Sequence, residues 1–254
     1  MLATAAATAG IAVLVNRYLF SRKPTKSQNY HDDNENPFQD PITSIEELRQ
    51  VIPAGLSGSK VENAHKVVSQ LDHQMMEFIQ QSPMVFLATA NAQGLPFVSP
   101  KGDAPGFVQV TSDGRQLLLP DRPGNRLIFG WQNILENPNV GMLFQIPGND
   151  TTLRISGTAR LYRDRTLCHR FAARGLDATV VLVVQVQYAF FHCSKAYIRS
   201  QLWKPETWPK EPMKVKFGPY FSSVSMIQQQ IDKGVDNHFH LVQQSVDGVC
   251  AEPS

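Results

Sequence analysis

The sequence predicts a mainly β fold with flanking helices, an α+β architecture centred on an antiparallel barrel. Its 254 residues, 42% of them hydrophobic, can bury the core of one main domain of ordinary size. Short apolar runs follow one another closely from residue 83 onward, and turn signals such as "AQG" and "SDG" separate them. Because few helical patterns intervene, an antiparallel barrel is favoured over a doubly wound sheet.

Residues 1–23 form a hydrophobic segment that we interpret as a targeting or anchor segment outside the fold. Residues 2–15 carry no charge, and basic residues accumulate up to Lys26 before the first acidic residue, Asp32. This pattern fits a mitochondrial presequence or a short membrane anchor whose basic flank faces the cytosol. A tail without function, in a cytoplasmic protein, is the alternative. The polar residues 24–41 cannot bury much surface and are expected to be a linker.

Two helices are expected between the linker and the first apolar run. The first is the stretch "ITSIEELRQVI", in which Thr43 or Ser44 can serve as N-cap and Glu46 or Glu47 can return the reciprocal hydrogen bond. The second covers about residues 60–81, where apolar residues recur at helical spacing. Both helices are expected to cover the β-rich region that follows.

The β-rich region contains seven predicted strands and one predicted helix. The strands are the apolar runs at residues 83–91, 95–100, 106–110, 115–120, 139–147, 151–163 and 178–193. The helix covers about residues 126–136, between the fourth and fifth runs. This order of elements is the basis for the predicted barrel.

The connection "PDRPGNR", between the fourth strand and that helix, has the composition of an anion site. Gly124 lets the backbone approach a ligand closely, Asn125 can cap the helix, and Arg122 and Arg126 supply positive charge with forked donors. Together with the positive end of the helix dipole, these residues suit a phosphate. An ordinary capped turn, with Asp121 paired to an arginine, explains the same residues equally well.

Charge and cysteine usage exclude some classes of function. The formal net charge is +2, with 24 basic and 22 acidic residues, so the composition gives no indication of nucleic-acid binding. The three cysteines, Cys168, Cys193 and Cys250, are far apart, which argues against a disulfide framework or a structural zinc site and fits a reducing compartment. His169 and His192 adjoin cysteines but lack the spacing of a chelate, and we expect no metal site.

Four motifs occur in order along the chain: "FLATANAQGLPFVSPKGDAPGFV", "LLLPDRPGNR…NILENPNVGMLF", "LRISGTARLY" and "VVQVQYAFFHCSKAYIRSQLWKPETWP". This ordered set resembles the pyridoxamine 5′-phosphate oxidase-like flavoproteins, over roughly residues 42–210. The resemblance implies an FMN-binding split β-barrel, here residues 42–212 with the N-terminal helices. Residues 213–254 form a C-terminal extension outside the resemblance. The same resemblance implies a homodimer in which each flavin lies in a cleft between the subunits.

The resemblance also implies sites for the cofactor. In this family the strand–loop–helix of "PDRPGNR" holds the FMN phosphate, which implies that role for Arg122, Asn125 and Arg126, and Asp121 is a further cofactor-binding candidate. In the run "PFVSPKG" the family's Lys-Gly pair is present, whereas Pro96 stands where the family has an arginine.

Two residues of "PFVSPKG" are expected at the flavin ring. Ser99 and Lys101 can face the isoalloxazine, where a cation stabilises the negative charge of the reduced ring. The alternative for Lys101 is a solvated lysine in a turn.

The motifs that hold the vitamer substrate in true pyridoxamine phosphate oxidases are altered here. In "RFAARGLD", Arg174 matches, but Arg170 replaces a tyrosine and the family's serine is absent. We therefore do not expect the vitamer to be the substrate, although Arg170 and Arg174 allow an anionic one. In "KAYIRSQLWKPETWP", Arg199 and Trp203 would share a helical face beside the flavin if the helix continued that far, and a packing role is equally compatible.

These observations lead to two hypotheses about function. The first is an FMN-dependent oxidoreductase acting on a small, anionic organic substrate, with no catalytic side chain identified because the isoalloxazine carries out the chemistry. The second is a non-catalytic module that binds flavin or haem for storage, sensing or chaperoning.

Overall fold

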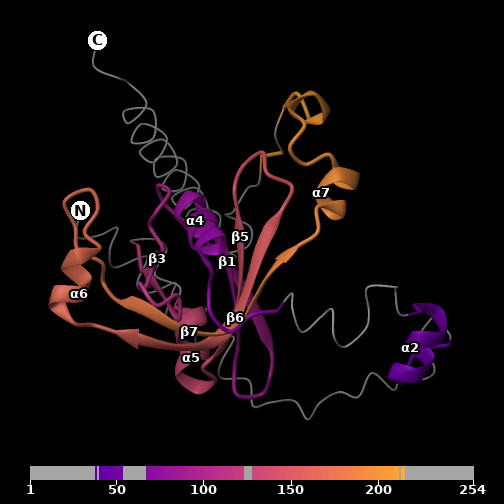
Figure 1. The fold of residues 1–254 in the computed structure, drawn as a ribbon, viewed down its shortest axis with the longest axis horizontal. Helices are drawn as coiled ribbons and strands as arrows, with labels where there is room; N and C mark the ends of the chain where they lie inside the picture. Colours follow the sequence, from indigo (N-terminus) through magenta and orange to yellow (C-terminus); the bar gives the residue numbers. More distant parts are fainter. Residues whose placement is uncertain (1–37, 39, 54–66, 123–127, 212, 215–254) are drawn as a thin grey trace, which may run out of the picture. The chain divides into compact units, whose positions relative to one another are not determined.

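The computed structural model describes residues 38, 40–53, 67–122, 128–211, 213 and 214. The chain divides into two compact units, Met1–Pro205 and Glu206–Ser254, and the sheet lies in the first (Figure 1). The predicted N-terminal segment, most of the predicted linker and most of the C-terminal extension lie outside the described residues. Across the described ranges, no helix combines the length and the apolar character needed to cross a membrane.

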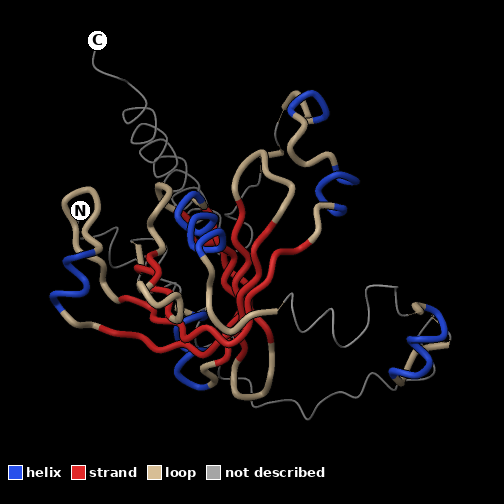
Figure 2. Tube along the Cα trace, in the orientation of Figure 1, coloured by secondary structure: helices blue, strands red, loops and turns tan. Residues whose placement is uncertain are grey.

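Seven strands form one antiparallel sheet in the order β2-β1-β5-β6-β7-β4-β3 (Figure 2). They correspond to the seven apolar runs, which confirms the prediction of a mainly β, antiparallel fold with flanking helices. Their bounds are β1 Met84–Ala90, β2 Pro96–Gly102, β3 Gln109–Val110, β4 Gln116–Pro120, β5 Asn139–Gln145, β6 Thr152–Tyr162 and β7 Val181–His192.

The two longest strands, β6 and β7, pair at the centre of the sheet and join its two parts, β2-β1-β5 and β4-β3. They have 11 and 12 residues and pair along their whole length. The first half of β6 pairs with β5, and β1 and β2 follow β5 toward one edge of the sheet. The first half of β7 pairs with β4, and β3 follows β4 at the other edge. Their register shifts between Ser156 and Gly157, where a Cβ on Gly157 would lie 2.0 Å from the Gln185 carbonyl oxygen. A side chain would not fit at this irregularity.

The helix α4, His73–Gln81, packs on the core that these strands enclose. Asp72 is its N-cap and accepts a hydrogen bond from the Met75 backbone at 2.8 Å. Met75, Phe78 and Ile79, which share one face of the helix, are buried. The helix therefore covers the sheet, as predicted.

The predicted start of this helix is wrong for residues 67–72. Val68 exchanges two backbone hydrogen bonds with Ala189 of β7, and the Leu71 amide donates to the Gly114 carbonyl at 2.8 Å. These pairings hold the segment extended, so the helix begins only after its cap. Residues 60–66 lie outside the described residues.

The helix α2, Ile45–Val51, begins as the sequence predicts. The Ser44 hydroxyl accepts from the Glu47 amide at 3.1 Å, and the Glu47 carboxylate accepts from the Thr43 amide at 2.8 Å. None of its residues is buried, and Ile45 and Val51 are 67% and 69% exposed. The expectation that this helix covers the β-rich region stays a prediction.

Three further α-helices follow among the described residues. The helix α5, Phe129–Glu136, begins three residues later than predicted, and Ile128 at its N-cap position makes no side-chain capping bond. Asn125, which the sequence predicts as the cap, lies outside the described residues. The helices α6, Arg165–Arg170, and α7, Lys195–Ser200, lie before and after β7.

Candidate functional site

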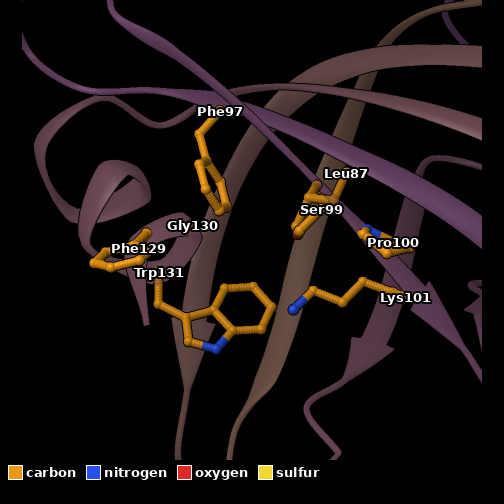
Figure 3. A pocket seen from close by; sticks show the side chains of 8 residues that line it. All are labelled: Leu87, Phe97, Ser99, Pro100, Lys101, Phe129, Gly130 and Trp131. Atoms are coloured by element: carbon orange, nitrogen blue, oxygen red, sulfur yellow. The ribbon is translucent and has the colours of Figure 1, made fainter. Parts of the chain in front are cut away.

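A cavity of about 340 Å³ opens between β2 and α5 (Figure 3). Its volume is at the lower end of the range for small-molecule sites. Three of its side chains are aromatic and one is cationic. The lining residues are Leu87, Phe97, Ser99, Pro100, Lys101, Phe129, Gly130 and Trp131.

Strand β2 positions one wall of this cavity. Alternate residues of a strand share a face, and Phe97, Ser99 and Lys101 point toward α5 (Figure 3). β2 is an edge strand of the sheet, and its register is fixed by pairing with β1 from Pro96 to Gly102. The structure thus brings the two predicted ring-facing residues, Ser99 and Lys101, into one pocket.

Helix α5 supplies the opposite wall. Phe129 meets Phe97 edge to face, with ring centroids 5.8 Å apart and an interplanar angle of 75°. The buried Asn133 side chain donates to the Thr89 hydroxyl at 3.1 Å, which ties the helix to β1. This contact fixes the rotation of α5 and with it the position of Trp131.

Lys101, Trp131 and Asp121 form a cluster at the cavity wall. The Lys101 ammonium lies 4.5 Å from the centroid of the Trp131 ring, and the Trp131 indole donates a hydrogen bond to the Asp121 carboxylate. Burial lowers the pKa of Lys101, and the charge of Asp121 offsets part of that shift. Burial also raises the pKa of Asp121, against the charge of Lys101 and the bond from Trp131. Partial desolvation therefore disfavours the charge on both groups.

Arg122 belongs to a different cluster. Its Nε donates to the Asp103 carboxylate at 2.6 Å, and a terminal nitrogen donates to the Phe171 carbonyl at 2.6 Å. Arg174 donates to the other carboxylate oxygen at 2.8 Å. Burial raises the pKa of Asp103, but a hydrogen bond from the Ala104 amide and the two arginines outweigh it, so the net pKa lies below its ordinary value. Among the described residues, Arg122 forms its ion pair with Asp103 and not with its neighbour Asp121.

The other predicted site residues lie elsewhere. Arg170 is exposed, hydrogen-bonds to Gln109 and lies 5.8 Å over the Phe171 ring. Asn125 and Arg126 lie outside the described residues. The cofactor role of these two residues stays a prediction.

The expectation that Arg199 and Trp203 share a helical face is wrong. Helix α7 ends at Ser200, because Gln201 takes a left-handed conformation with φ 52°. Trp203 instead stacks on Tyr197, with centroids 6.0 Å apart, and its indole donates to the Asn149 carbonyl at 3.1 Å. Trp203 thus packs α7 against the β5–β6 connection.

The histidine and cysteine pairs do not form a chelate in the described structure. His169 contacts Asp177 at 2.9 Å, Cys168 is buried, and Cys193 is exposed. Within the described ranges, no group of three or more His, Cys, Asp or Glu side chains is placed to hold a metal ion.

Residues 71–193 match a protein-family model described as pyridoxamine 5′-phosphate oxidase. Over this segment the chain is similar to the pyridoxamine 5′-phosphate oxidase-like family. The matched segment begins before α4 and ends just after β7, so it contains the whole sheet and both walls of the cavity.

Solved structures of several proteins resemble the chain. HupZ of Group A Streptococcus is 18% identical, with 48% of this chain and 93% of that chain covered and a TM-score of 0.38. A putative pyridoxamine 5′-phosphate oxidase of Lactobacillus delbrueckii is 21% identical, with 49% and 98% covered and a TM-score of 0.39. An F420 reductase is 19% identical, with 48% and 98% covered and a TM-score of 0.33. No curated protein matches the sequence.

The aromatic half of the cavity was missed by sequence reasoning. Phe97 could have been found, because it lies two and four residues before Ser99 and Lys101 and so shares their face of β2. No sequence pattern identified Trp131 as a cavity residue, because a tryptophan within an apolar helical pattern is equally well explained by core packing.

Proposed function

We propose that the protein is an FMN-dependent oxidoreductase that acts on a small, anionic organic substrate, with the isoalloxazine ring in the cavity between β2 and α5. The observation that carries this proposal is the composition of the cavity. Aromatic side chains, Phe97, Phe129 and Trp131, face a single cation, Lys101, among its lining residues. Similarity to the pyridoxamine 5′-phosphate oxidase-like family over residues 71–193 supports the same assignment.

The side chains of the cavity fit a flavin ring. Its apolar and aromatic walls suit a flat heteroaromatic ring, and the Ser99 hydroxyl and Lys101 ammonium suit the polar edge of that ring. When bound, FMN supplies the redox chemistry. The protein would orient the ring between its walls and exclude water, while Lys101 stabilises the negative charge that accumulates on reduction.

The phosphate and the substrate are assigned to positively charged residues that do not line the cavity. We place the FMN phosphate at Arg122, Asn125 and Arg126, where Arg122 is held in position by Asp103. An anionic substrate is assigned to Arg170 and Arg174, whose side chains are exposed. As in the resemblance, two copies of the chain would form a homodimer with the flavin between them.

Calorimetric titration of FMN and riboflavin tests the ring assignment. Lys101→Met should weaken binding of both flavins by a similar factor, roughly tenfold or more, because the lost charge-assisted contact is to the ring that they share. Lys195→Met, which removes an exposed lysine of α7, is the matched control and should leave both affinities unchanged. A loss for FMN alone would place Lys101 at the phosphate, and no loss for either flavin would refute the assignment.

Turnover separates an enzyme from a module that only binds its ligand. The FMN-loaded protein should be reduced by a nicotinamide donor and reoxidised by an added acceptor, which is followed by flavin absorbance. Stable binding of FMN without such a cycle, over a panel of donors and acceptors, would favour the non-catalytic alternative.

A further inference from the structure

A two-residue turn between α6 and β7 holds Arg174 in an unfavourable backbone conformation. The Ala173 amide donates to the Leu176 carbonyl at 2.9 Å, and the Leu176 amide donates to the Ala173 carbonyl at 3.1 Å. Between them, Arg174 and Gly175 have φ angles of 52° and 77°. Turns with positive φ at both central residues favour Asn, Asp or Gly there. An arginine at the first position is uncommon, and residues in such conformations cluster at functional sites.

The Arg174 side chain reaches a carboxylate that is distant in the sequence. One of its terminal nitrogens donates to Asp103 Oδ1 at 2.8 Å, across 71 positions. Arg122 Nε donates to Oδ2 of the same carboxylate at 2.6 Å, and only 6% of the Asp103 side chain is exposed. Because one buried carboxylate binds both arginines, their guanidinium groups lie next to each other although they come from different loops.

Both guanidinium groups keep donors for a further partner. An arginine has five N–H donors on three nitrogens. Among the described residues, Arg122 uses its Nε for Asp103 and one terminal nitrogen for the Phe171 carbonyl, and Arg174 uses one terminal nitrogen for Asp103. The Arg174 side chain is also 67% exposed. The two arginines can therefore donate to different oxygens of one anionic group.

The charges of this cluster leave room for an anion. Burial raises the pKa of Asp103, but a backbone hydrogen bond and both arginines outweigh it, so the carboxylate is ionised at neutral pH. Two guanidinium groups thus share one negative charge. The neighbouring carboxylate Asp121 is influenced more by the charge of Lys101 than by that of Arg122. One positive charge of the pair stays uncompensated, beside an Arg122 side chain that is only 20% exposed.

We infer that Arg122 and Arg174, held side by side by Asp103, form a single site for a phosphate group. The inference rests on the proposed function for the assignment of Arg122 to the FMN phosphate. It moves Arg174 from the substrate to that phosphate, so the anion is held from the loops that follow β4 and α6.

Two flavins that differ in the phosphate test the role of Arg174. Arg174→Asn removes the guanidinium and suits the left-handed backbone, so the turn should be preserved. Calorimetric titration into the full-length protein should show FMN bound roughly tenfold more weakly, the effect of one charge-assisted contact, and riboflavin unchanged. Arg122→Gln should have the same selective effect. The matched control is Arg163→Asn, which removes an exposed arginine just before α6 and should leave both affinities unchanged.

Two outcomes would overturn the inference and leave the flavin assignment standing. In the first, Arg174→Asn binds FMN as tightly as the wild type does. In the second, it loses affinity for FMN and riboflavin by the same factor, which would show that the substitution acts on the ring or on the fold and not on the phosphate.

Inorganic phosphate separates a failure of the flavin assignment from a failure of this inference. If the wild type does not bind FMN, the flavin assignment is refuted, and phosphate binding followed by ³¹P NMR then decides the inference. Weaker phosphate binding by both Arg122→Gln and Arg174→Asn, with Arg163→Asn unaffected, would support a shared site. Absence of phosphate binding, or binding that does not depend on Arg174, would overturn it.

Discussion

Asp103 is the residue on which the loops around the candidate site converge. Its carboxylate accepts hydrogen bonds from the Arg122 and Arg174 side chains and from the Ala104 amide, and only 6% of its side chain is exposed. Arg122 extends the network to the Phe171 carbonyl. One carboxylate thus ties the segment after β2 to those after β4 and α6.

Replacing this carboxylate should destabilise the protein. Asp103→Asn keeps the size of the side chain but removes the charge that compensates two guanidinium groups, of which Arg122 is only 20% exposed. We expect a loss of about 1–3 kcal/mol in the free energy of unfolding, measured by urea denaturation. Asp177→Asn is the matched control, because Asp177 and its partner His169 are exposed, and its effect should stay within about 0.5 kcal/mol. Equal effects of the two substitutions would contradict this role.

The same carboxylate predicts a dependence on pH. The folded-state pKa of Asp103 lies below the ordinary value of 3.8, so between these two values the unfolded chain binds more protons than the folded one. The stabilisation is complete above the ordinary value and disappears as the pH falls through the folded-state pKa. Below about pH 4, wild-type stability should therefore fall more steeply than that of Asp103→Asn.

At this scale the sequence identified residue types but not their partners. The composition of "PDRPGNR" singled out Asp121 and Arg122, whose role at a cofactor site stays a prediction. Their separation into two clusters depends on residues distant in the chain, since Arg122 binds Asp103 and Phe171, 19 and 49 positions away. Local composition carries no information about such contacts.

At the scale of elements, strands were predicted well and helix boundaries less well. The strands have local signals, short apolar runs bounded by turn residues, and all seven occur where expected. The start of α4 was misplaced because Val67, Val68 and Leu71 fit helical spacing. Their extended conformation is set by backbone pairing with Ala189 and Gly114, which no local pattern encodes.

The β6–β7 irregularity gives a prediction for an element. Gly157→Ala would place a methyl group 2.0 Å from the Gln185 carbonyl oxygen, which belongs to backbone and cannot move aside easily. We expect a loss of about 1–3 kcal/mol in the free energy of unfolding, measured by thermal or urea denaturation. In the matched control Gly141→Ala in β5, the new methyl group meets the Ala88 Cβ at 3.6 Å, an ordinary contact. That variant should unfold like the wild type, and a similarly stable Gly157→Ala would show that the strands can separate there.

At the scale of the whole molecule, the proposed homodimer should not depend on the N-terminal residues. Residues 1–40 are interpreted as a targeting segment and linker, so a chain without them should fold and form the same dimer. Sedimentation at micromolar concentration in the presence of FMN measures this for both chains. A monomer would contradict the shared flavin cleft, and a truncated chain that failed to fold would contradict the interpretation of the deleted residues.

The two edges of the sheet have a consequence for behaviour at high protein concentration. An exposed edge strand is a template for strand addition and aggregation when its backbone offers a long row of free donors and acceptors. β2, at one edge, contains Pro96 and Pro100, which have no N–H to donate, and β3, at the other, has only two residues. Neither edge can readily be extended by a further strand. Copies of this domain are therefore expected to associate through side-chain contacts and not through backbone pairing that continues the sheet.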